Sequence, residues 1–103
     1  MTEHTLTPNS SSPHHVIIVG WDSRIRTFFA RVYRDAPGTN PENVLWEGLN
    51  TGEYTNATDI VDLVTPYTDT TTVNIPKLTD ALTEDQDIAR YAPRGRNNAA
   101  TRW

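Results

Sequence analysis

The sequence predicts an α+β fold of two layers, in which a three-stranded antiparallel meander is followed by two helices packed on one face. Two observations support this prediction. Apolar residues recur at intervals of about two in the first half of the chain and of three and four after Gly52, which are the periods of strands and helices. The 103 residues leave room for a single domain with one core, so we expect the helices to cover the sheet.

Three short segments have the composition of strands, and they are residues 16–21, 26–34 and 43–48. The first is β-branched and apolar on both faces, as in a central strand. In the second, Phe28, Ala30 and Val32 share one face, and Arg31 stands at the centre of the other. We therefore expect the face without the charge to lie against the core. Short connections between sequential strands favour an antiparallel meander.

Two helices are expected after the strands. In the first, the residues at helical spacing are Ile60, Leu63, Val64 and Tyr67; in the second, Leu78, Ala81, Leu82 and Asp85 share one face. Asn56 is a suitable N-cap for the first helix, and Pro66 disfavours helix beyond Thr65. The second helix is expected to start near Pro76. A capping box from Thr83 to Gln86 leaves one bent helix or two short ones open.

Both ends of the chain are polar, and we expect both to be disordered. Residues 1–13 hold two prolines and a serine run, with Leu6 as the only large apolar side chain after the initiator Met. Such a segment buries too little surface to offset the entropy lost on ordering. Residues 93–103 have a similar composition and are basic. The expected division is an N-terminal tail over 1–13, one domain over 14–92 and a C-terminal tail over 93–103.

The sequence carries no recognisable catalytic or metal-binding pattern. It contains no Cys, which excludes disulfides, thiolate ligands and Cys nucleophiles. Its three histidines, at positions 4, 14 and 15, lie in or beside the expected tail, away from any serine-nucleophile motif. We therefore expect a protein that is not an enzyme and that has no cofactor or metal. No apolar run approaches the ~20 residues of a membrane span, and no signal peptide is evident, so we expect a cytoplasmic protein without membrane contact.

Aromatic residues are concentrated in the predicted strands and the turn after them, at positions 21, 28, 29, 33, 46 and 54. One buried face of a small sheet does not require so many. Alternation sends Phe29 and Tyr33 to the face away from the helices, beside Arg31. Aromatic residues and Arg dominate binding hot spots. We therefore predict a partner-binding surface of Phe29, Arg31, Tyr33 and Trp21, which contacts another protein or a second copy of the chain in a dimer.

The charge distribution leaves two alternatives open beside the solvated surface that most charge runs form. The formal net charge is −4, and residues 42–87 carry ten acidic residues against one basic residue. In the first alternative, a nucleic acid contacts Arg24, Arg26, Arg34, Arg94 and Arg96. It is disfavoured because the acidic excess opposes phosphate binding. In the second, an acidic face inhibits a nucleic-acid-binding protein through Asp80, Glu84, Asp85 and Asp87.

The order of three short motifs resembles a group of small uncharacterised bacterial proteins, often carried on plasmids or other mobile elements. The motifs are Gly20-Trp-Asp, Thr27-Phe-Phe-Ala-x-Val and Leu45-Trp-x-Gly, and they are followed by a helix ending at Pro66-Tyr67 and another starting at Pro76. The resemblance spans roughly residues 16–90. It implies an accessory protein that acts by binding, and it brings no catalytic residues.

Overall fold

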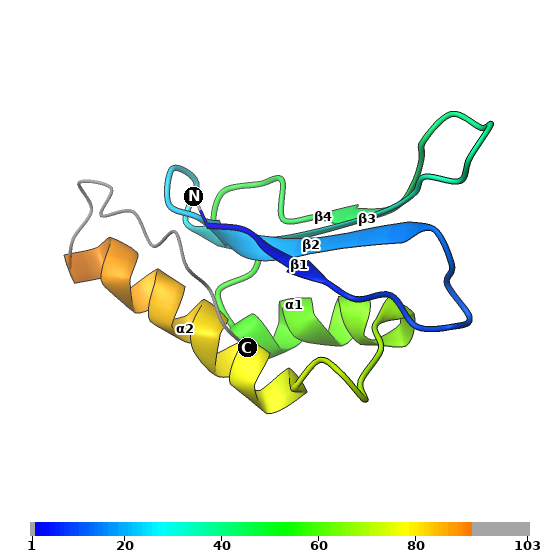
Figure 1. Cartoon of the computed structure of the whole chain (residues 1–103). Coiled ribbons are helices and arrows are strands. Elements are labelled where there is room, and N and C mark those ends of the chain that lie inside the picture. Colours follow the sequence, from blue (N-terminus) through cyan, green and yellow to red (C-terminus); the bar gives the residue numbers. More distant parts are fainter. Residues whose placement is uncertain (1, 92–103) are drawn as a thin grey trace.

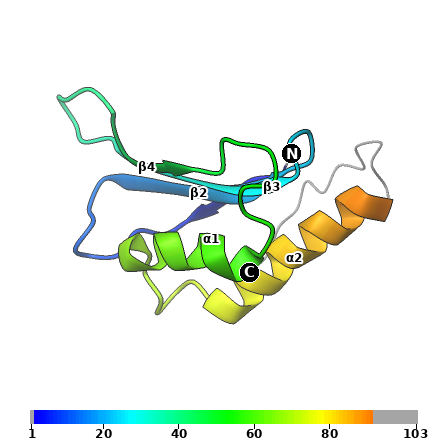
Figure 2. The ribbon, with the colours of Figure 1, turned by 180° about the vertical axis from the view of Figure 1, so that it is seen from behind.

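A computed structural model describes residues 2–91 of the chain. Its elements are β1 (His4–Leu6), β2 (His15–Asp22), β3 (Thr27–Arg34), β4 (Glu42–Glu47), α1 (Ala57–Val64), a 3₁₀ turn (Thr65–Tyr67) and α2 (Ile75–Tyr91). The strands form one antiparallel sheet in the order β1-β2-β3-β4, and both helices lie on the same side of it (Figures 1 and 2). The predicted α+β class is confirmed, but the sheet has four strands instead of three.

The core lies between the sheet and the two helices. Its fully buried side chains include Ile17, Val19, Phe28, Val32, Ile60, Val64, Leu78 and Leu82. The predicted core face of β3 is confirmed, because Phe28, Ala30 and Val32 have no exposed surface. Burying each large apolar side chain contributes about 1.5–3 kcal/mol, so two faces that are each apolar stabilise one another on contact.

Helix α1 follows its sequence signals. The Asn56 side chain accepts a hydrogen bond from the backbone N of Thr58 at 2.9 Å, as an N-cap should. The α-helix ends at Val64, and the chain continues as a 3₁₀ turn that contains Pro66. The predicted cap and the predicted end of this helix are both confirmed.

Helix α2 is one continuous element from Ile75 to Tyr91. At its start, the Asn74 side chain accepts from the backbone N of Lys77 at 3.1 Å. Thr83 forms no internal cap, because its hydroxyl donates to the Thr79 carbonyl one turn earlier, at 3.0 Å. Of the two arrangements left open by the sequence, the single helix is the one observed.

The N-terminal segment is not the tail that its composition predicts. Residues 4–6 form β1, which pairs with β2 in a register that places His4 opposite Val19 and Leu6 opposite Ile17. Further along, the Asn9 side chain donates to the Pro66 carbonyl at 2.8 Å. This segment is held by backbone pairing and polar contacts with distant residues, which a composition argument based on apolar area does not detect. The predicted C-terminal tail, 93–103, lies outside the described residues.

Candidate functional site

Within residues 2–91, one face of the sheet carries no helix (Figures 1 and 2). Because Phe28, Ala30 and Val32 of β3 point toward the helices, alternation places Phe29, Arg31 and Tyr33 on the opposite face. Trp46 of β4 joins them, since it is the register partner of Arg31. We call these four residues, Phe29, Arg31, Tyr33 and Trp46, the outer patch.

Arg31 is held between two aromatic rings of the outer patch. Its guanidinium carbon lies 4.7 Å from the centroid of Tyr33 and 4.7 Å from that of Trp46. Its Nε and Nη2 each donate to Oδ1 of Asn43 at 3.3 Å. Each cation–π contact at an exposed site contributes about 0.5–1 kcal/mol. These contacts orient the guanidinium while using two of its five N–H donors.

Exposed apolar surface gathers at the β4 edge of the sheet. Among the residues whose side chains the structure describes, the exposed large hydrophobic ones are Val44 (40% exposed), Trp46 (47%) and Leu49 (56%). The pairing of β3 with β4 shifts register between Val32 and Tyr33, which leaves Val44 as the extra residue of a bulge. β4 stands at the end of the strand order, so its outer edge is open within the described residues.

The turn after β4 has a fixed shape. Gly48 has a φ of +86°, and a Cβ there would collide with the carbonyl oxygen of Phe28 and lie 2.6 Å from the Cα of Phe29. The Glu53 carboxylate accepts from the backbone N of Leu49 at 3.1 Å and of Asn50 at 3.3 Å. The exposed Leu49 is therefore presented by an ordered turn.

Two carboxylates, those of Glu47 and Glu53, lie at the C-terminal end of β4 and in the turn after it. The Tyr54 hydroxyl donates to Oε1 of Glu47 at 3.0 Å. This hydrogen bond raises the pKa of the Tyr54 phenol, and burial and the negative charges of Glu47, Glu53 and Asp59 raise it further. The negative charge of Glu47 is therefore paired with a neutral phenol and not with a basic side chain.

Trp21 does not belong to the binding surface that the sequence predicted. It is 6% exposed and packs against Phe28 in the core, edge to face, with ring centroids 4.8 Å apart. Its strand turns every second residue inward, so Trp21 follows Ile17 and Val19 into the core. The tryptophan on the open face is Trp46, which was not among the residues predicted for the binding surface. Its signal was the Leu45-Trp46 pair, of which only one side chain can face inward.

The arginines proposed to contact nucleic acid do not come together. Arg24 and Arg26 lie at the turn between β2 and β3, whereas Arg34 ends β3 at the far end of the sheet. The Arg24 guanidinium is bonded to the Asp22 carboxylate at 3.2 and 3.3 Å. Arg94 and Arg96 lie outside the described residues.

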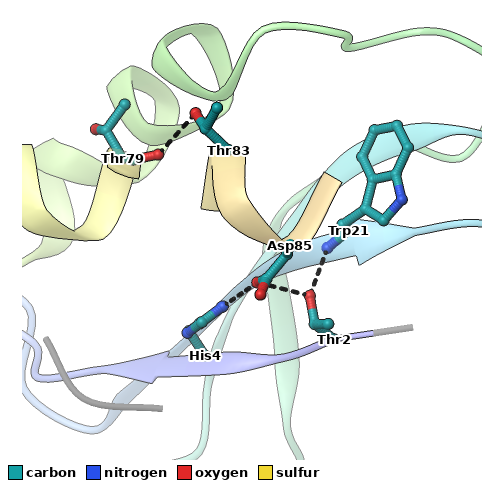
Figure 3. A network of polar contacts seen from close by, with 6 residues as sticks. All are labelled: Thr2, His4, Trp21, Thr79, Thr83 and Asp85. Carbon is teal, nitrogen blue, oxygen red and sulfur yellow. Dashed lines mark hydrogen bonds and ion pairs between the residues drawn. The ribbon is translucent and has the colours of Figure 1, made fainter. Parts of the chain in front are cut away.

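One of the four residues predicted for the acidic face is buried. Asp80, Glu84 and Asp87 are exposed on α2, but Asp85 is 9% exposed and faces β1. Its Oδ2 lies 2.6 Å from Nε2 of His4 and accepts from the Thr2 hydroxyl at 3.0 Å (Figure 3). Asp85 shares the inward face of the helix with Leu78 and Leu82, so it fastens β1 to α2.

Residues 2–91 lack two further features. This part of the chain holds no group of three His, Cys, Asp or Glu residues arranged to bind a metal ion. Its helices are too short or too polar to cross a membrane.

No protein family, curated protein or solved structure matches the chain significantly. The resemblance to small bacterial proteins therefore stays a prediction.

Proposed function

We propose that the protein is a non-enzymatic binding module that recognises a partner protein through the outer patch. The observation that supports this most directly is the position of Arg31, held between Tyr33 and Trp46 on the face that carries no helix. In keeping with the resemblance, we propose that it serves as a cytoplasmic accessory protein of a bacterium or of its mobile elements.

The residue types of the outer patch and the fixed orientation of Arg31 favour binding. Trp, Tyr and Arg are the residues enriched in binding hot spots. An Arg that is already oriented loses less side-chain freedom when a partner arrives, which strengthens binding. The same side chains add little to the core, because the opposite side of β3 supplies it.

A protein partner is favoured over nucleic acid. Arg31 is the one basic residue of the outer patch, and Glu42 and Glu47 lie on the neighbouring strand. Nucleic-acid affinity comes largely from several cations that neutralise phosphates together. Arg24 and Arg26 lie at one end of the sheet and Arg34 at the other, so the nucleic-acid alternative is weaker. The acidic-inhibitor alternative is weaker as well, since Asp85 is buried.

The test compares binding by three forms of the protein. Immobilised wild type, the double variant Arg31→Ala/Tyr33→Ser and the control Thr83→Ala are exposed to a lysate of the encoding organism. Thr83 is exposed on α2, in the layer opposite the patch. We expect a specific protein to bind wild type and control, and to bind the double variant at least about tenfold more weakly. Equal binding to all three, with the fold intact by circular dichroism, would contradict the proposal.

A further inference from the structure

The two edges of the sheet differ in what they offer to an added strand. β1 is short, covering His4–Leu6, and its outward residue Thr5 is polar. β4 is longer, and the exposed apolar side chains Val44, Trp46 and Leu49 lie on it and on the turn that follows. An open strand edge presents backbone N–H and C=O groups that pair readily with an extended peptide.

Building on the proposed function, we propose that the β4 edge binds an extended segment of the partner protein by strand addition, and that this segment alternates apolar with basic side chains. The backbone of β4 supplies the pairing, and the two faces of the sheet select the two kinds of side chain.

The apolar half of the alternation follows from the outer face. A strand added to β4 lies about 4.8 Å away, and every second side chain points to the face that carries Trp46. Trp46 is about half exposed, and its indole is fixed on one side by Arg31. An apolar side chain there covers the remaining surface. The ordered turn offers Leu49 as a further apolar contact at the end of the strand.

The basic half follows from the opposite face. The intervening side chains of the added strand point to the side on which Glu47 bonds to Tyr54. The Glu53 carboxylate lies in the turn that follows β4, where it accepts from the backbone N of Leu49 at 3.1 Å. β4 itself carries two acidic residues and no basic one. Lys or Arg in the partner segment would complement this charge.

The same charges disfavour the other occupants. In an antiparallel pair of two β4 strands aligned at their centres, Glu42 of each copy would lie opposite Glu47 of the other, and β4 itself carries no basic residue. Like charges across a strand pair are destabilising. A nucleic acid would bring further negative charge to the same edge. An apolar and basic segment of another protein is the occupant that fits both faces.

The probe is a synthetic peptide, acetyl-(Val-Lys)₄-amide, titrated into ¹⁵N-labelled full-length protein at low salt. One control peptide replaces Lys by Glu. In a second control peptide, backbone nitrogens are methylated along both edges of the extended peptide. This removes the N–H donors needed for strand pairing and keeps the side chains. The protein variants are Trp46→Ala and Glu47→Gln, with Asp80→Asn on α2 as a charge control. An eight-nucleotide single-stranded DNA tests the nucleic-acid occupant.

We expect the Val-Lys peptide to shift the amide resonances of residues 42–49 and to protect β4 amides from hydrogen exchange. We expect Glu47→Gln to weaken binding roughly fivefold and Asp80→Asn to leave it unchanged. The Glu peptide and the N-methylated peptide should not bind. Binding of the N-methylated peptide as tightly as its parent would overturn strand addition, as would no binding of the parent at millimolar concentration.

Two other results would assign the edge to another occupant and overturn the inference. One is a dimer in light scattering that Trp46→Ala dissociates; the other is tighter binding of the DNA at the same amides. The proposed function is judged separately, because it depends on the capture experiment with Arg31→Ala/Tyr33→Ser. If that variant loses capture while the peptide changes no β4 amide resonance, the proposed function is retained and strand addition is rejected.

Discussion

At the scale of single residues, Asp22 makes the stability of the fold depend on pH. Its buried carboxylate accepts from the backbone N of Arg24 at 3.0 Å and from the Arg24 guanidinium. The side-chain hydrogen bond from Arg24 lowers the pKa of Asp22 by more than burial raises it. A carboxyl with a lowered pKa in the folded state stabilises the fold above its unfolded pKa of about 3.9, and this contribution is lost as the pH falls through the folded pKa. We expect the free energy of unfolding of Asp22→Asn to fall less than that of wild type between pH 5 and pH 2, as measured by urea denaturation. Parallel pH profiles for the two proteins would show that the pair contributes nothing.

At the scale of elements, the attachment of β1 to α2 depends on one acidic residue of the helix, Asp85, and not on another, Asp80. Asp85 is buried against His4 and Thr2, whereas Asp80 is exposed on the same helix. Removing the Asp85 carboxylate takes away an acceptor from buried groups, so we expect Asp85→Ala to lower the free energy of unfolding by about 1–3 kcal/mol. Asp80→Ala should change it by no more than about 0.5 kcal/mol. The Thr2 amide donates to the Trp21 carbonyl, so alternation directs the His4 and Leu6 amides toward β2, and their hydrogen exchange should accelerate in Asp85→Ala alone. An equal effect of both substitutions would refute the fastening role.

The elements that the sequence predicted correctly are those with local signals. The cap at Asn56 and the break at Pro66 delimit α1, and the alternation of β3 identified its core face, because each depends on residues close together in the chain. β1 escaped prediction for the opposite reason. Its partners are β2 and Asp85, the latter 81 positions away from His4, and no local pattern reports a contact at that distance.

At the scale of the whole molecule, the layered arrangement decides which aromatic residues are available for binding. Helices on one side of the sheet bury the inward side chains of β2 and β3, and within residues 2–91 no helix lies on the other side (Figures 1 and 2). Phe29, Arg31 and Tyr33 were predicted on the open face because β3 has one apolar and one mixed face. β2 is apolar on both faces, so its sequence does not indicate where Trp21 points. Trp46 is brought beside Arg31 by the pairing of β3 with β4, which is known only once the sheet is assembled.

A comparison of Trp21 with Trp46 provides the most direct test of the claim that the outer patch is free for binding and not required for folding. Trp21 is buried against Phe28, and Trp46 is about half exposed beside Arg31. The measurement is the free energy of unfolding of Trp46→Ala and Trp21→Ala in urea. We expect Trp46→Ala to lose about 1 kcal/mol or less, which is the contribution of an exposed cation–π contact. Trp21→Ala should lose about 3–5 kcal/mol, as core truncations do. A loss from Trp46→Ala as large as that from Trp21→Ala would show that the outer patch holds the fold together, and would contradict the proposed binding role.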